Sequence, residues 1–397
     1  MLPTMFDLIQ PASRILVALP ARMRRLRLAA SLLALMPCAA ESATAIQTPA
    51  VLPEGQGFAP VWHGPHTAQL DPALARLDRA LARRAAADGL TRSKNPTPID
   101  VTEDRALDDG IGEGLADDAL PGTVPERYSI SVTAAGLALH ATGPLGTLHA
   151  MSTLALTARS GGWAFGTQSA CPKVRWRALR VDVTQRFLSL TDVERRIDTA
   201  ALLGLNILHL TVARGDVFRV ESRRYPKLGS GSTIYTHAQI HALIDYAAAR
   251  GLHVVPEIDL SGRSPTLLSA YPDLGHDTID LARPETAQFL LVLYGEMGRL
   301  FGSHALDPGM TLGSAPEPAR TALRERLATR LKRDGGTMIV TDTPRTPSHA
   351  AITSGADGLV SPGDVRAADA MWSGGAASDA SRRATIINTI LKPGPLE

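Results

Sequence analysis

From Val174 onward, short apolar segments alternate with longer segments whose apolar residues recur at helical spacing. The short segments have the length and the apolar content typical of buried strands. The predicted strands cover residues 178–183, 206–212, 252–260, 310–314, 337–342 and 357–362, with residues 384–391 as a further candidate. The predicted helices between them cover residues 191–203, 236–250, 284–301 and 319–333. This alternation predicts a parallel sheet whose strands are joined by helices.

The number of strand–helix units favours a closed barrel over an open sheet. The fold class expected for residues 170–397 is therefore α/β, a (β/α)8-type TIM barrel. About six units are clear in the sequence, residues 384–391 are a candidate seventh strand, and no eighth strand is evident. The sequence ends with KPGPLE soon afterwards, which leaves open whether the barrel is complete at its C-terminus.

The residues before the barrel have a different pattern. Apolar residues at helical spacing predict a helix at residues 72–88. Alternating residues at 128–132 and 137–141 predict a hairpin, with a further helix at residues 145–158 packed on it. We therefore expect a small α+β domain over residues 46–165.

Residues 1–45 have the pattern of an export signal. Four arginines precede a short apolar core at residues 28–36, and small residues follow it. This order is typical of a secretory signal peptide and is too short to span a membrane as a mature helix. We expect cleavage after Ala40 or Ala45 and a periplasmic or extracellular protein. No later segment reaches the roughly 20 apolar residues of a membrane span.

The charge and the motifs of the chain exclude several function classes. The net charge is +2, and no run of Lys or Arg occurs outside the N-terminus, which argues against nucleic-acid binding. No metal-ligand spacing, glycine-rich phosphate loop or Gly-x-Ser-x-Gly elbow is present in the sequence. No cofactor and no metal site are expected on these grounds.

Barrel enzymes carry their reacting groups at the carboxyl ends of the strands. Asp182 ends the first predicted strand, and Glu257 and Asp259 lie near the end of the third. Alternation places Glu257 and Asp259 on one face of their strand, where they could serve as an acid–base pair. A buried network with Arg177 or Arg180 explains the same carboxylates equally well.

The barrel segments contain, in this order, VRWRALRVDVTQRF, IDTAALLGLNILHL, FRVESRRYPKL, IYTHAQIHALIDYAAARGLHVVPEIDLSG and AYPDL. Together they resemble the catalytic barrel of glycoside hydrolase family 20, the β-N-acetylhexosaminidases. The preceding segment ERYSISVTAAGLALHATGPLGTLHAMSTL resembles the small domain that precedes that barrel. The resemblance covers residues 125–365.

The resemblance implies removal of terminal N-acetylhexosamines with retention of configuration. In this family the acetamido oxygen of the substrate attacks the anomeric carbon, a glutamic acid protonates the leaving oxygen, and the preceding aspartate orients the acetamido group. The implied partners are glycans that contain N-acetylhexosamine, such as chitooligosaccharides or peptidoglycan fragments. The substrate-binding residues that match the family motifs are Arg177, Asp182, His209, Glu257 and Asp369.

The strand ends depart from the family pattern. In the segment MTLGSAPEP the catalytic Asp-Glu pair of the family falls on Ala315 and Pro316. Alanine cannot orient an amide and proline cannot protonate a leaving group, so no catalytic pair is expected. The other departures are Gln185–Arg186, Thr211, Arg214–Gly215 and Ser261–Gly262–Arg263.

Three interpretations remain at this point. The favoured one is an exported hexosaminidase-like protein that is catalytically impaired or dead. The second is an active exo-β-N-acetylhexosaminidase that uses a displaced acid, Glu317 or Asp259. The third is a sugar-binding or interaction protein of the cell envelope.

Restoring the missing pair is a test of how much of the site has changed. We expect the Ala315→Asp/Pro316→Glu double variant to show no hydrolysis of a chromogenic N-acetyl-β-glucosaminide, because the ends of the second and third strands are also altered. A substantial rate from this double variant would show that the other changes matter little.

Overall fold

The computed structural model describes residues 58–90, 96–104, 126–159, 162–229, 233–302, 305–309, 317–333, 337–338, 349–353, 359–372 and 379–392. The expected signal peptide and the catalytic-pair positions Ala315 and Pro316 lie outside these residues. All described residues belong to one compact unit, residues 40–397. The expected domain boundaries remain predictions.

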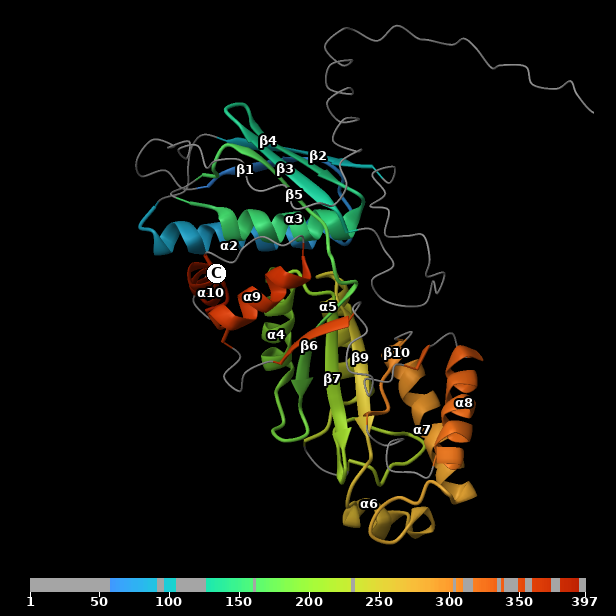
Figure 1. The fold of residues 1–397 in the computed structure, drawn as a ribbon. Coiled ribbons are helices and arrows are strands. Elements are labelled where there is room, and N and C mark those ends of the chain that lie inside the picture. Colours follow the sequence, from blue (N-terminus) through green and yellow to red (C-terminus); the bar gives the residue numbers. More distant parts are fainter. Residues whose placement is uncertain are drawn as a thin grey trace, which may run out of the picture. The chain divides into compact units, whose positions relative to one another are not determined.

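The first part of the described chain is a five-stranded mixed sheet with two helices (Figure 1). The strand order is β1-β2-β4-β3-β5, in which β3 is antiparallel to both of its neighbours. The strands are β1 (Pro60–His63), β2 (Thr97–Glu103), β3 (Tyr128–Thr133), β4 (Gly136–Ala141) and β5 (Gly166–Ala170). The helices are α2 (Leu70–Ala87) and α3 (Pro144–Thr157), which pack against each other. The predicted hairpin and both predicted helices are confirmed.

The second part contains parallel strands joined by helices, as in a (β/α) barrel. Strands β6, β7 and β9 are neighbours in chain order, and the last described strand, β12, pairs with the first, β6. The strands are β6 (Trp176–Asp182), β7 (Ile207–Arg214), β8 (Val217–Phe218), β9 (His253–Asp259), β10 (Ala305–Leu306), β11 (Thr337–Met338) and β12 (His349–Thr353). The helices are α4 (Leu190–Leu202), α5 (His237–Ala248), α6 (Pro265–Ala270), α7 (Pro284–Phe301), α8 (Glu317–Arg333), α9 (Pro362–Met371) and α10 (Ala380–Ile390).

Two predicted strands are wrong. Residues 384–390 of the candidate strand at 384–391 are helical and belong to α10, because their buried residues recur at helical spacing, as at Ala384, Ile387 and Ile390. Residues 359–361 are not in a strand, and α9 begins at Pro362. The cause is a capping box in which the Ser361 hydroxyl accepts from the backbone N–H of Asp364 at 3.2 Å.

A short strand that the sequence did not predict, β10, lies next to β9. The predicted strand at residues 310–314 falls outside the described residues. β10 at Ala305–Leu306 pairs with β11, and the next residue, Asp307, forms a parallel bridge with Glu257 of β9. The segment that continues the sheet beyond β9 therefore ends at Asp307.

The part of the barrel interior nearer the amino ends of the strands is an apolar layer. Its side chains come from β6, β7, β9 and β10, and they form a buried cluster separate from the main core. Its members are Trp176, Ala178, Ile207, Val255 and Ala305. Since side chains alternate along a strand, the next inward residues lie nearer the carboxyl ends of the strands.

A buried ionic cluster lies at the opposite, amino end of β6. The guanidinium of Arg177 pairs with Glu126, donates to the carbonyl of Gly204 at 2.9 Å and lies 4.8 Å from the ring centroid of Trp372. Glu126 also lies 2.7 Å from Nε2 of His149. Arg177 is fully buried, so all these interactions are shielded from water.

The charge state of Glu126 is set by these neighbours. Burial alone would raise its pKa, but the Arg177 guanidinium and the His149 ring together lower the pKa from 4.5 to about 2. The folded-state pKa therefore lies below the unfolded value. The stabilisation that this carboxylate contributes is complete above about pH 5 and is lost as the pH falls toward 2.

The Glu126→Gln variant tests this cluster. We expect the free energy of unfolding at pH 7 to fall by about 3–5 kcal/mol, because the variant leaves the buried Arg177 without its charged partner. Urea denaturation measures this loss. The control is Asp379→Asn at an exposed pair with Arg159 at 3.4 Å, which should cost less than about 1 kcal/mol. Equal losses in the two variants would contradict the assignment.

Candidate functional site

A polar layer lies above the apolar layer, toward the carboxyl ends of the barrel strands. The strand register places Arg180 beside His209, Asp182 beside Thr211, and Thr211 beside Glu257. Asp307 is the residue bridged to Glu257. These residues come from four strand segments that are distant in the sequence, so the barrel is what brings them together.

Glu257 is at the centre of this layer. Its side chain is only 4% exposed, and it accepts from Thr211 Oγ1 at 2.8 Å and from Arg180 at 3.0 Å through Oε2. Its other oxygen accepts from Arg214 at 3.3 Å. Two guanidinium groups and a hydroxyl therefore neutralise and orient a buried carboxylate.

Arg214 reaches this layer because β7 has a bulge. The pairing with β9 shifts between Thr211 and Ala213, which adds one residue to β7. Bulges near strand ends re-aim the side chains that follow them. The guanidinium of Arg214 contacts Glu257 and also lies 3.4 Å from a carboxylate oxygen of Asp182.

Asp182 has little freedom to take part in chemistry. Its Oδ1 accepts from the backbone N–H of Thr184 at 2.8 Å and from the Thr184 hydroxyl. Its Oδ2 faces Arg214. Both oxygens are therefore engaged within the protein.

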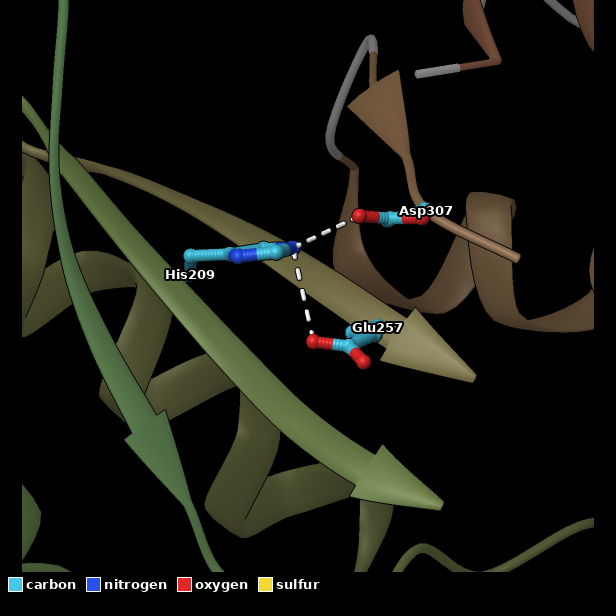
Figure 2. A group of neighbouring side chains, drawn as sticks. All are labelled: His209, Glu257 and Asp307. Carbon is cyan, nitrogen blue, oxygen red and sulfur yellow. Dashed lines mark ion pairs between the residues drawn. The ribbon is translucent and has the colours of Figure 1, made fainter. Parts of the chain in front are cut away.

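His209 and Asp307 lie beside Glu257. Figure 2 shows the three side chains converging from β7, β9 and the end of β10. Nε2 of His209 lies 3.1 Å from Oδ2 of Asp307 and 3.9 Å from Oε2 of Glu257. All three residues are buried. No pattern in the sequence pointed to Asp307, because the two-residue strand before it is too short for a periodic pattern.

Two expected substrate-binding residues lie elsewhere, and these predictions are corrected. Arg177 is at the amino end of β6, buried with Glu126, and its position is structural. Asp369 lies in α9 and pairs with Arg383 of α10. The end of α9 reaches the segment before β6, since Lys173 N–H donates to the carbonyl of Met371. Burial raises the pKa of Asp369, and Arg383 opposes this shift.

The two candidates for a displaced acid lie in β9 and α8. Asp259 is 4% exposed, and its Oδ1 accepts from the backbone N–H of Ser261 at 3.0 Å. Gly309, with φ +56°, packs directly against it, since a Cβ on Gly309 would lie 2.6 Å from Cβ of Asp259. Glu317 is the first residue of α8.

The part of the chain that carries most of this site is similar to a known protein family. Residues 174–299 match the family model described as glycosyl hydrolase family 20, catalytic domain. This segment is therefore that of a glycoside hydrolase family 20 catalytic domain. The match includes β6, β7 and β9, of which β7 carries His209 and Arg214 and β9 carries Glu257.

Curated family 20 relatives match part of the chain. It is 30% identical over 230 residues to a β-hexosaminidase of Akkermansia muciniphila, which covers 49% of this chain and 47% of the relative. It is 31% identical over 164 residues to a β-N-acetylhexosaminidase of Cellulomonas fimi, covering 38% and 33%. The matches thus span less than half the length of these relatives.

Solved family 20 structures have the same fold. A chitobiase of Flavobacterium johnsoniae superposes with a TM-score of 0.58 at 22% identity, covering 78% of this chain and 53% of the other. A mutant β-hexosaminidase of Streptomyces plicatus in complex with its product GlcNAc superposes with a TM-score of 0.57 at 21% identity, covering 80% and 70%. The catalytic domain of these family 20 structures is a TIM barrel, in agreement with the expected fold class.

No helix among the described residues is both long and apolar enough to cross a membrane.

The Thr211→Val variant tests the polar layer. Valine keeps the shape but cannot donate to the buried Glu257, so we expect the free energy of unfolding to fall by about 1–3 kcal/mol. The control is Thr385→Val on the exposed side of α10, which should change stability by less than about 0.5 kcal/mol. Urea denaturation of both variants measures the difference, and a neutral Thr211→Val would show that this hydrogen bond contributes nothing.

Proposed function

We propose that this chain is an exported hexosaminidase-like protein that does not hydrolyse glycosides. The observation that carries the proposal is the position of Arg214, whose guanidinium contacts both Asp182 and Glu257 at the carboxyl ends of the barrel strands. Both carboxylates are then held in ion pairs. Neither is available as the acid or base that glycoside hydrolysis needs.

The electrostatics of the layer support this proposal. Glycoside cleavage develops positive charge at the anomeric carbon, and a family 20 site stabilises that charge with carboxylates. Here the side chains of Arg180 and Arg214 are 37% and 46% exposed, and their positive charge at the carboxyl ends of the strands opposes this intermediate. The sequence adds Ala315 and Pro316 at the positions of the catalytic pair. Losing a general acid alone costs about 10²–10⁴ in rate.

The ligand class that we propose is a glycan ending in N-acetylhexosamine. Its support is ancestry, since the relative from Streptomyces plicatus is described in complex with GlcNAc. Export is also part of the proposal, and it rests on the basic and apolar pattern of residues 1–45.

Hydrolysis of a chromogenic N-acetyl-β-glucosaminide by the purified protein tests the proposal, with the Akkermansia muciniphila β-hexosaminidase as the positive control. We expect no turnover above the rate without protein, because both carboxylates are paired and the acid pair is absent. Glu317→Gln and Asp259→Asn are measured beside the wild type. Turnover by the wild type that either variant abolishes would identify a displaced acid and overturn the proposal.

Calorimetric titration with GlcNAc separates the remaining interpretations. Binding without turnover would indicate a sugar-binding role for the altered barrel. Absence of both would indicate that the barrel no longer recognises this sugar.

A further inference from the structure

The buried group formed by His209, Glu257 and Asp307 has unused ligand atoms. Nε2 of His209 and Oδ2 of Asp307 are both inaccessible to solvent, and neither has a hydrogen-bond partner among the described residues. They lie 3.1 Å apart and yet do not meet the geometry of a hydrogen bond. Leaving such atoms unsatisfied in a protein interior costs roughly 1–3 kcal/mol each. Their arrangement therefore calls for a further ligand.

We propose that His209, Glu257 and Asp307 bind one zinc ion inside the barrel. Each residue offers one ligand atom, and these atoms all lie within 4.8 Å of one another. In a tetrahedral zinc site with bonds of about 2.0–2.2 Å, neighbouring ligand atoms are roughly 3.3–3.6 Å apart. The observed separations of 3.1 and 3.9 Å from Nε2 of His209 lie on either side of this range.

The ligand types favour zinc over the alkaline-earth ions. Calcium takes six to eight oxygen ligands, and magnesium keeps several waters in an octahedral shell. One imidazole and two carboxylates in a closed interior are too few ligands for these ions. They suit a transition metal with a lower coordination number, such as zinc. Such a set of three protein ligands leaves one tetrahedral position open.

The carboxylates are already fixed by their other contacts. Oδ1 of Asp307 accepts from the backbone N–H of Gly309 at 2.8 Å, which leaves Oδ2 directed toward His209 (Figure 2). Glu257 is held by Thr211, Arg180 and Arg214 from the side of the strand ends. Outer contacts of this kind orient the ligands of metal sites.

The local charge also favours a cation. Three carboxylates, those of Asp182, Glu257 and Asp307, share this cluster with two guanidinium groups, those of Arg180 and Arg214. With a neutral imidazole the cluster keeps a net negative charge, and a divalent ion offsets it. The competing arrangement is an ion pair between His209 and Asp307 without a metal, since their side-chain atoms lie 3.1 Å apart.

The spacing in the sequence explains why no metal motif was found there. The three ligands are about 50 residues apart, one in each successive strand–helix unit. Metal motifs in sequences depend on ligands within a few residues of one another. This site depends on the barrel, and it does not depend on whether the protein hydrolyses glycosides.

The experiment is zinc loading of the tag-free full chain. The protein is treated with a chelator, incubated with zinc sulfate and desalted, and bound zinc is measured by mass spectrometry. We expect one zinc per chain and a melting temperature that rises with zinc concentration. The Asp307→Asn variant should lose more than the roughly 10–100-fold in affinity that changes to outer contacts cost, because it removes a direct ligand. The matched control is Asp369→Asn, a half-buried carboxylate paired with Arg383, which should bind zinc as the wild type does.

A measurement on the wild type covers the case in which Asp307→Asn does not fold. X-ray absorption at the zinc edge should show one imidazole in a shell of nitrogen and oxygen. Substoichiometric zinc after loading, zinc retained by a folded Asp307→Asn variant, or a shell with several imidazoles would each overturn the proposal. The first of these outcomes would favour the ion pair of His209 with Asp307 alone.

Discussion

The charged hydrogen bond between Arg177 and Glu126 is the contact on which the arrangement of this chain depends. Removing a guanidinium and a carboxylate from water costs several kcal/mol for each ion, so the pair persists only because its remaining donors and acceptors are also satisfied. Asn206 at the start of β7 and His149 of α3 supply those contacts to Glu126. One buried carboxylate thus joins the segment before β3 to the first two strands of the barrel.

The side chains inside the barrel change from apolar to charged along the barrel axis. Small and large apolar side chains fill it near the amino ends of the strands, whereas arginines and carboxylates occupy the carboxyl ends. In a hydrolase of this family the carboxyl end must leave carboxylates free to meet a sugar. Here the extra residue in β7 turns Arg214 inward, and the available negative charge is used within the protein. A change at the end of β7 therefore determines how the carboxylates of the two neighbouring strands are paired.

Periodicity predicted most of the fold, because long helices and buried strands leave a clear pattern. The three strands that carry the family match, β6, β7 and β9, were predicted to within two residues. Short elements were missed, since β10 has two residues and α9 starts from a local cap. For the site, Glu257 and His209 were found, but Asp307 followed an unpredicted strand. Arg177 was wrongly predicted to bind substrate. The motif identifies the strand that carries a residue, but it does not show where along the strand the side chain is buried or what it contacts.

The contact between Trp372 and Arg177 can form only late in the synthesis of this chain. Its indole covers the Arg177 guanidinium and donates to the carbonyl of Gly204, where a Cβ would lie 2.6 Å from the ring. Arg177 leaves the ribosome almost 200 residues before this indole does. Contacts between such distant residues form late, and unfinished chains expose surfaces that aggregate. The guanidinium of Arg177 in a nascent chain therefore stays uncovered until the segment that contains Trp372 has been synthesised and has folded onto it.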